Sequence, residues 1–413
     1  MTEQDMERLG PAFAEYLAPF RACCAHRDTA RNFDNYCRGL LSDLPRKSVE
    51  PIALASGTTV RTLQVFLANR QWDHDGARSL LQRHLAEQVR QQPNDGLGTI
   101  GVIDETSCRK WGDQTPGVQR QYLGCVGKVD SGIVTVHVGV AKGTFQALLD
   151  AELFLPESWA ADRQRCRAAG IPDSVIYRPK WQIAFDQLVR LADAGHRFDW
   201  LTFDEYYGSK VPFLDLLTVF GQKFVGEVPV NFAVTTRAGS RWADQVLTAG
   251  QAKRGERFRL KRKTTNDVVW RATERHIQVG EYTWRLLVAI HEATAEVKYF
   301  VTNDLDTPLK KLLRVAFRRP TIEHSFRLAK QEAGLMHFEG RQYQALERHL
   351  ILTLIVLGFV AVHTERLRGE KSPDHSRANQ PGAQRPLRPT AASPLRPKPH
   401  RPSHSRHPIP SAA

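Results

Sequence analysis

The chain has 413 residues, which is enough for two to three domains with a real buried core. Hydrophobic residues make up 41% of it and charged residues 25%, as in an ordinary soluble globular protein, and its formal net charge of +14 indicates a polyanionic partner such as nucleic acid or, alternatively, a membrane surface. Its six cysteines include no CxxC pair and have no zinc-site spacing with histidine, which argues against a structural zinc module.

The N-terminal residues 1–95 are predicted to be helical, because apolar residues recur there at three- and four-residue spacing. We expect no signal peptide, since residues 1–10 carry acids and lack an apolar run, and the protein is placed in the cytoplasm in association with the nucleoid. Ala53, Gly57 and Leu63 have the spacing of a helix-turn-helix. We therefore predict a helical DNA-binding domain over 1–95, with ordinary helix packing as the alternative.

Strands and helices are predicted to alternate over residues 96–233. The segment 99–107 (TIGVIDETS) is an apolar, β-prone run that ends in acids. Two further strands are expected after it, joined by a turn at Asp130-Ser131-Gly132. An amphipathic helix at 181–195 then precedes a second strand that ends in acids, at 198–208 (FDWLTFDEYYG). This alternation predicts an α/β fold.

The second half of the chain is predicted to contain a β-rich segment, a helical segment and a basic tail. Residues 234–303 are predicted to form a β-rich insertion of short, aromatic, alternating strands, and residues 304–368 a helical zone. The apolar run 350–362 is too short to span a bilayer and fits a buried core helix, so we expect no membrane partner. Residues 369–413 are rich in Pro and Arg and are predicted to be a disordered basic tail, which either contacts DNA nonspecifically or extends into solvent.

Three acids carry the predicted chemistry. Asp104 and Asp204 end two of the strands, where a carboxylate lies on a rigid element at the rim of a sheet. Glu323 follows Pro320 and therefore lies in the first turn of a helix, where the helix dipole favours an acid. Carboxylates from separate elements can hold two Mg²⁺ or Mn²⁺ ions about 4 Å apart for phosphodiester displacement. We predict Asp104, Asp204 and Glu323 as metal ligands and catalytic residues.

Basic residues are predicted to contact DNA at two places. Arg319 precedes Glu323 by four residues and Lys330 follows it by seven, two turns further on, so both can grip phosphates of the strand being cut. A basic run in the insertion alternates with Phe258 and Leu260, so that its charges can line one face of a strand, with a merely solvated strand as the alternative. The DNA-binding residues predicted there are Arg257, Arg259, Lys261, Arg262 and Lys263.

With these motifs the chain resembles the DDE transposases of bacterial insertion sequences, which share a ribonuclease-H-like catalytic fold. One large group of them carries Tyr-x2-Arg-x3-Glu-x6-Lys around its catalytic Glu, and this sequence has Arg319-x3-Glu323-x6-Lys330, with Ala316 at the Tyr position. The resemblance covers roughly residues 35–365. Its other motifs are IDETS at Asp104, RQYLGCVGKVD after it, FDEYYG at Asp204, and IEHSFRLAKQEAGLMHFEGRQYQALERHLILTLIVLGFV at Glu323.

The resemblance implies a ribonuclease-H-like mixed sheet with flanking helices. Residues 96–233 would form the first part of the catalytic core and residues 304–368 its C-terminal helices, with the β-rich insertion contacting transposon-end DNA or a hairpin intermediate. The first Asp would lie on the central strand and the second on its neighbour, so that Asp104, Asp204 and Glu323 match the metal-binding triad. Transposon ends and target DNA are the implied partners, bound by a homodimer.

Other acidic, histidine and tryptophan residues are expected to have structural or DNA-contacting roles. Glu105 and Glu205 are predicted to point away from the adjacent aspartates, because successive strand residues face opposite sides. His324 lies about 100° around the helix from Glu323, which favours a packing or phosphate role over metal ligation. Three tryptophans of the insertion either pack its core or stack on a flipped base: Trp242, Trp270 and Trp284.

The leading hypothesis is a transposase that hydrolyses phosphodiesters at transposon ends with the help of metal ions and transfers the freed strand to target DNA. The alternative is a DNA-binding protein derived from a transposase, with an idle catalytic site. A hydrolase with paired carboxylates, such as a glycosidase, is disfavoured by the net charge of +14 and by the basic residues that flank Glu323.

Overall fold

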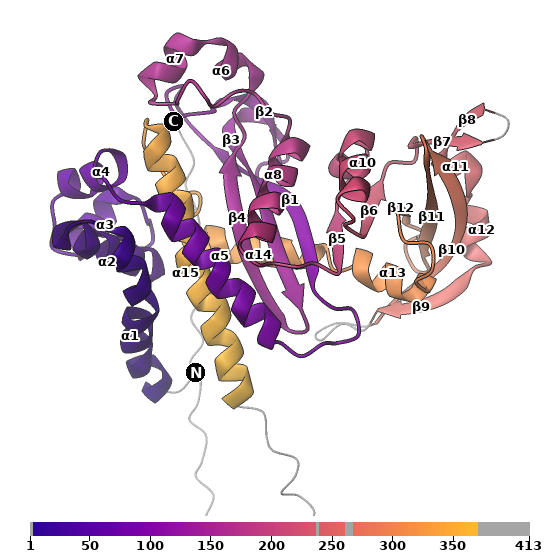
Figure 1. The fold of residues 1–413 in the computed structure, drawn as a ribbon, viewed down its shortest axis with the longest axis horizontal. Coiled ribbons are helices and arrows are strands. Elements are labelled where there is room, and N and C mark those ends of the chain that lie inside the picture. The colour runs from indigo at the N-terminus through magenta and orange to yellow at the C-terminus, as the bar shows by residue number, and fades with distance from the viewer. Residues whose placement is uncertain (1–2, 237–238, 261–266, 371–413) are drawn as a thin grey trace, which may run out of the picture. The chain divides into compact units, whose positions relative to one another are not determined.

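A single mixed sheet dominates the fold. The computed structural model describes residues 3–236, 239–260 and 267–370, with their side chains from residue 9 to residue 368 (Figure 1). Within these residues twelve strands belong to the sheet. The strands are β1 (Ile100–Arg109), β2 (Gln119–Leu123), β3 (Lys128–Lys142), β4 (Phe145–Leu153), β5 (Trp200–Phe203), β6 (Phe224–Val228), β7 (Ala233–Thr236), β8 (Gly239–Trp242), β9 (Glu256–Leu260), β10 (Val268–Val279), β11 (Tyr282–His291) and β12 (Val297–Thr302).

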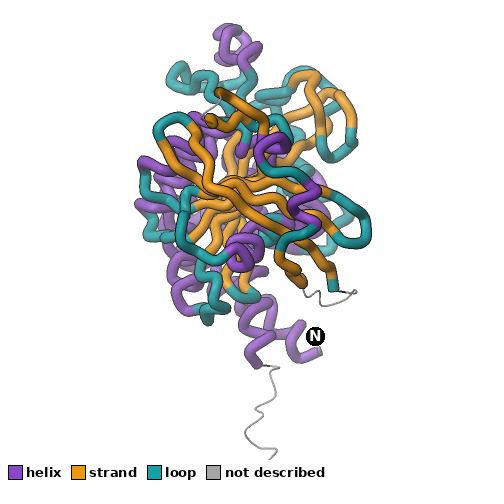
Figure 2. Tube along the Cα trace, turned by 90° about the vertical axis from the view of Figure 1, so that its right-hand side faces the viewer, coloured by secondary structure: helices purple, strands orange, loops and turns teal. Residues whose placement is uncertain are grey.

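Strand β1 lies between partners of opposite direction. It pairs antiparallel with β3 and parallel with β5, and β5 pairs parallel with β6. Residues 100–103 of β1 are all buried, as expected for a strand with helices over both faces. Figure 2 shows the strands gathered in the middle with helices around them. This confirms the predicted fold class, an α/β ribonuclease-H-like mixed sheet with flanking helices. Strand β1 stands third in the strand order, between β3 and β5.

The helices differ greatly in length, from single turns to a core helix of 28 residues. They are α1 (Glu3–Leu17), the 3-10 helix η1 (Ala18–Cys23), α2 (Arg27–Leu41), α3 (Val49–Ala55), α4 (Val60–Ala68), α5 (His74–Gln91), α6 (Glu157–Ala161), α7 (Arg163–Ala168), α8 (Lys180–Asp193), α9 (Glu205–Gly208), α10 (Val211–Val219), α11 (Ala243–Val246), α12 (Ala249–Lys253), α13 (Leu309–Ala316), α14 (Pro320–Glu332) and α15 (Tyr343–Glu370).

Helix α15 packs against both the N-terminal helices and strand β4 (Figure 1). By length and apolar composition alone it could cross a membrane over Tyr343–Arg368, but 83% of its most apolar stretch is buried inside the protein. The predicted apolar run 350–362 lies within this helix, and its residues 350–359 are buried. Burying such a stripe against neighbouring elements is the main stabilising contribution of a core helix.

The hairpin of β2 and β3 differs from the prediction. Its tip lies between Leu123 and Lys128, where Gly127 has a φ of +68° that favours glycine. The predicted turn at Asp130-Ser131-Gly132 is wrong, because these residues lie inside β3, where Asp130 Oδ2 pairs with Arg109 Nε at 3.0 Å. Strand β4, which pairs with β3, was not predicted at all.

The β-rich stretch continues the central sheet. Strand β12 pairs with β6, and β11 and β10 follow outward. Trp284 is 1% exposed and its ring centroid lies 5.7 Å from that of Phe224 on β6, while Trp270 lies 4.9 Å from Phe317. Both tryptophans therefore pack the core, whereas Trp242 is 54% exposed.

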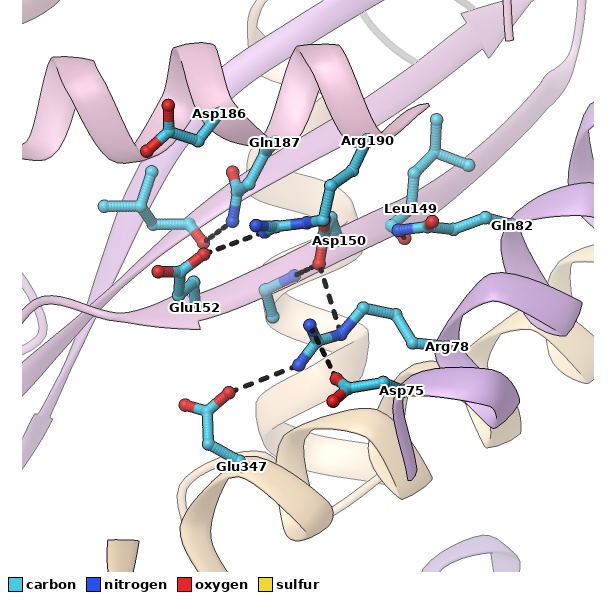
Figure 3. A network of polar contacts seen from close by, with 12 residues as sticks. Asp75, Arg78, Gln82, Leu149, Asp150, Glu152, Asp186, Gln187, Arg190 and Glu347 are labelled. Atoms are coloured by element: carbon cyan, nitrogen blue, oxygen red, sulfur yellow. Dashed lines mark hydrogen bonds and ion pairs between the residues drawn. The ribbon is translucent and has the colours of Figure 1, made fainter. Parts of the chain in front are cut away.

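A network of buried charges ties α5, α8 and α15 to strand β4 (Figure 3). Asp150 of β4 is inaccessible to solvent and contacts Arg190 of α8, with Oδ2 and Nη2 3.1 Å apart. Arg190 Nη2 also lies 2.8 Å from Glu152 Oε2. Arg78 of α5 reaches Glu347 of α15, with Nη2 and Oε2 3.3 Å apart. Because buried charges require partners, the network fixes these helices on the sheet.

Candidate active site

Asp104 and Asp204 lie level with each other on neighbouring strands. Strands β1 and β5 pair in parallel with Val102 opposite Thr202, so positions 104 and 204 come next on the same face. Asp204 follows β5 directly and caps α9, where its Oδ1 accepts the N–H of Tyr206 at 3.1 Å. The two aspartates therefore lie side by side, but the prediction that Asp104 ends its strand is wrong, because pairing with β3 carries β1 on to Arg109.

Glu323 approaches the same point from α14. It lies in the first turn of that helix, after Pro320, as predicted. Arg319 joins it to the sheet, because the Nη1 atom of Arg319 lies 3.0 Å from Glu323 Oε1 and 3.0 Å from Asp104 Oδ2. The two carboxylate oxygens thus lie at most twice that distance apart. Arg319 therefore bridges Asp104 and Glu323, and the charge of Asp204 acts on it as well.

The acids of the site raise the pKa values of their neighbours. Asp104 is 9% exposed, and burial raises its pKa to about 7; the Arg319 guanidinium lowers that pKa and the charge of Asp204 raises it. Burial alone would lower the pKa of Arg319, but the carboxylates of Asp104, Asp204 and Glu323 outweigh it and raise that pKa. The Arg319 guanidinium therefore interacts with all three acids, and a further positive charge would stabilise the ionised form of Asp104.

A cavity of about 510 Å³ opens beside these residues. The basic residues on its wall come from α14, where Lys330 lies two turns beyond Glu323 and burial lowers its pKa. The cavity thus combines acids at its base with cations along one wall, as a phosphodiester strand requires. Its lining residues are Asp104, Glu105, Thr106, Ser107, Tyr122, Gly124, Cys125, Val134, Glu323, Phe326, Arg327, Lys330 and Gln331.

The donor chemistry fits hard divalent cations, although the side chains are not arranged around one. Across residues 3–236, 239–260 and 267–370, no group of three or more His, Cys, Asp or Glu side chains is placed to hold a metal ion. At this site Arg319 is the reason, because its guanidinium lies between Asp104 and Glu323. The carboxylate oxygens and their excess negative charge are nevertheless what Mg²⁺ or Mn²⁺ prefers.

Glu105 faces away from the cluster of three acids, as the alternation along a strand predicts. Its carboxylate forms an ion pair with Lys180 of α8 and accepts a hydrogen bond from the Tyr207 hydroxyl at 3.3 Å. Asp104 meets α14 instead, so α8 and α14 cover opposite faces of β1. Glu105 therefore anchors a helix on the opposite face of the sheet. His324 contacts Arg327, with Nδ1 and Nη2 2.8 Å apart.

One acid near the site was missed by the sequence analysis. Glu227 of β6 comes next to Asp204 in register, because Phe203 pairs with Gly226. It forms an ion pair with Lys298 at 2.5 Å, and its charge contributes to the raised pKa of Arg319. The available signal was the same as for the two aspartates, namely an acid at the end of a buried strand (FVGEV).

The basic run lies on the outer strand β9. Arg257 and Arg259 are exposed and Phe258 is buried, as the alternation predicts. Arg257 Nη2 lies 3.1 Å from Glu292 Oε2, and Arg259 Nη1 lies 3.6 Å from Asp267 Oδ2. Surface pairs of this kind are weak and can exchange partners, so DNA contact here stays a prediction. The remaining members of the run lie outside the described residues: Lys261, Arg262 and Lys263.

Comparison with known proteins agrees with this geometry. A family model described as DDE superfamily endonuclease matches residues 19–289, which is more than half of the chain. The chain belongs to the DDE superfamily endonucleases. A probable transposase for insertion sequence element IS701 from Microchaete diplosiphon is 32% identical over 206 residues. That similarity covers 48% of this chain and 47% of the relative, so the chain spans about half the length of the curated relative it matches.

The family match of this DDE superfamily endonuclease includes two of the three acids. Asp104 and Asp204 lie within residues 19–289, and Glu323 lies beyond them. The assignment of Glu323 therefore depends on its position in the first turn of α14 and on the Arg319 contact. The helical segment 19–95 and most of the β-rich stretch also fall within the match.

Proposed function

We propose that this DDE superfamily endonuclease is a transposase that hydrolyses a phosphodiester at the ends of an insertion sequence and joins the freed 3′-hydroxyl to target DNA. The observation that carries the proposal is the contact of Arg319 Nη1 with both Asp104 and Glu323 at 3.0 Å, beside Asp204 in register. Asp104 and Glu323, which are separated widely in the sequence, line one cavity. The net charge of +14 fits a DNA partner.

The three carboxylates would hold two Mg²⁺ or Mn²⁺ ions. The chemistry that such a pair supplies is activation of the attacking oxygen and stabilisation of the leaving oxygen of a phosphodiester. Asp104 and Asp204 present their oxygens from the rigid sheet edge and Glu323 from a helix, and the Arg319 side chain turns away from the acids toward the DNA. Arg319, Arg327 and Lys330 then hold the phosphates of the strand being cut, which is mostly a task of positioning and charge stabilisation.

The N-terminal helices would bind the transposon ends. Helices α3 and α4 form a helix-turn-helix in which Ala53 and Leu63 are buried and Gly57 has a φ of +66° in the turn. Arg61 and Gln64 of α4 are exposed and lie three residues apart on one helix face. Arg and Gln read guanine and adenine edges. A homodimer would bring two such ends together.

A cleavage assay tests the proposal. The substrate is supercoiled DNA that carries the sequences flanking the coding gene, incubated with Mg²⁺ or with Mn²⁺. We expect nicking by the full chain, and a loss of at least about 1,000-fold in Asp104→Asn, Asp204→Asn and Glu323→Gln, because each removes a carboxylate ligand of the proposed metal pair. Glu332→Gln, at an exposed position of the same helix, is the matched control and should nick normally.

The alternative is a DNA-binding protein with an idle catalytic site. The position of Arg319 between two of the acids is the observation that favours it. The same assay separates the two functions: an idle site predicts binding to the flanking DNA without nicking under any divalent cation, and equal behaviour of all three acid variants.

A further inference from the structure

A large aromatic side chain stands exposed on the wall of the catalytic cavity. Tyr122 of β2 is 65% exposed and lines the cavity together with Asp104, Glu323 and Lys330. Its hydroxyl and ring belong to a strand that is held firmly, because the next residue, Leu123, is fully buried. A rigid aromatic ring that leaves its apolar face in water is suited to receive a flat partner.

The surroundings of Tyr122 on the hairpin are apolar and basic. Tyr122 pairs across the hairpin with Val129, which is 55% exposed, and Arg120 lies two residues before it on the same face of β2 and is also exposed. The hairpin thus presents an aromatic ring between an aliphatic neighbour and a guanidinium. Exposed aromatic rings interleaved with cations are the usual platform for unpaired bases of nucleic acid.

The opposite wall of the cavity supplies the complementary charge. Arg327 and Lys330 of α14 line it, and Lys330 lies close enough to Asp104 for their charges to interact. A nucleotide has both required features, a flat base and a negatively charged phosphate. A base inside a duplex is stacked on its neighbours and cannot offer its face, so the base must be unpaired.

We propose that Tyr122 is the stacking platform for an unpaired DNA base next to the phosphate held by Arg327 and Lys330. The inference rests on the proposed DNA-cutting function, which it deepens by assigning a single-stranded or flipped nucleotide to the site. Tyr122 contributes affinity through its ring and leaves the charge chemistry of the acids unchanged. Tyr122 is thus a positioning residue for the reaction.

The test is a binding comparison with two fluorescent oligonucleotides in EDTA, without any cleavage. One is an eight-residue oligothymidine and the other an abasic strand of the same length, which keeps the phosphates and lacks the bases. We expect the full chain to bind the oligothymidine about tenfold more tightly, a preference typical of one stacked base. Tyr122→Phe should keep this preference, whereas Tyr122→Ala should reduce it to near unity with affinity for the abasic strand unchanged.

Trp111 provides a matched control. It is 87% exposed, its ring lies 4.1 Å from the Arg109 guanidinium carbon, and it is outside the lining of the cavity. Trp111→Ala should leave the preference for bases intact. A Tyr122→Ala protein that still prefers oligothymidine tenfold overturns the proposal, as does a Tyr122→Ala protein whose changed property is its oligomeric state, which would make the hairpin a protein interface. Asp104→Asn should retain the preference, so loss of nicking and loss of base stacking are independent results.

Discussion

Two clusters of charge lie on the same sheet, one around Asp150 and one around Asp104, and they are compensated differently. Asp150 contacts Arg190 and lies near Arg78 (Figure 3). Its neighbour Glu152 contacts Arg190 and Arg178. At the other cluster, Asp104 and Glu323 share a single nitrogen of Arg319. Asp150 and Glu152 also share Arg190 Nη2, but each of them has a second arginine beside it, Arg78 for Asp150 and Arg178 for Glu152. Asp104 and Glu323 are held by the one Arg319 nitrogen that they share.

The Asp150 cluster is closed to solvent, whereas the Asp104 cluster is open. Asp150 is inaccessible, enclosed by α5, α8 and α15, whereas the Asp104 cluster opens to a cavity of about 510 Å³ and the Glu323 side chain is 58% exposed. A sealed and compensated network holds elements together, while an open and undercompensated one has room and charge for a ligand. The contrast supports the proposal that the Asp104 cluster binds a ligand while the Asp150 cluster stabilises the fold.

The largest expected effect lies in the sealed network. Asp150→Ala removes the fully buried acid that lies beside both the half-buried Arg190 and Arg78, so we expect the free energy of unfolding to fall by about 3–5 kcal/mol, as measured by urea denaturation. Metal-dependent nicking by the fraction that remains folded should persist. An unchanged unfolding free energy would show that Asp150 is not the anchor of α8.

A substitution in the Asp104 cluster should have the opposite effect on the free energy of unfolding. Burial makes the charged form of Asp104 unfavourable, so Asp104→Asn should raise the free energy of unfolding by on the order of 1–3 kcal/mol at pH 8 in EDTA while nicking is lost. Urea denaturation of the two proteins side by side measures this. A variant that loses stability as well as activity would place Asp104 among the structural acids.

Glu347 of the buried network should make the stability of the protein depend on pH. Burial raises the pKa of Glu347 to about 7, above its unfolded value, with Arg78 opposing the rise. The folded state therefore holds the proton that the unfolded state releases, so stability falls as pH rises from about 5 to 7. Glu347→Gln should remove on the order of 1–3 kcal/mol of this fall. Urea denaturation at several pH values in this range measures the effect. The account is contradicted if the free energy of unfolding changes with pH equally in the parent protein and in Glu347→Gln.

The smallest expected effect concerns the N-terminal helix-turn-helix. Arg61→Ala should weaken binding to the flanking DNA about tenfold, because one base-edge contact is worth roughly 1–3 kcal/mol. Stability should not change, since Arg61 is exposed. Electrophoretic mobility shifts with specific and scrambled duplexes measure the difference. An equal loss of affinity for the specific and the scrambled duplex would show that Arg61 contacts phosphates and not base edges.

The candidate site was largely predictable because local patterns located its three acids, although one strand end was placed wrongly. Asp204 follows the end of β5 and Pro320 marks the start of the helix that carries Glu323, whereas Asp104 lies in the middle of β1, which continues to Arg109. Glu227 has the same strand-end signature in a less acidic context and was passed over. Lys330 was placed by helical spacing, and it lines the cavity.

Other features depended on tertiary contacts that a local pattern cannot report. Strand β4 contains Asp150, which interrupts its apolar run, and the partners that make this burial tolerable come from helices far away in the sequence. The turn at Asp130 was predicted from turn-forming residue types, but Arg109 and the pairing with β1 hold that segment extended. The union of the β-rich stretch with the central sheet likewise depends on pairing between β12 and β6.

Binding of Mn²⁺ tests the central claim most directly. In a calorimetric titration of the full chain, the account predicts saturable binding that is lost or weakened at least about tenfold by each of Asp104→Asn, Asp204→Asn and Glu323→Gln, and retained by Glu332→Gln. If Glu323→Gln binds Mn²⁺ as the parent protein does, the helix acid does not share a metal site with the two aspartates, and the claim that three distant carboxylates form one site is contradicted.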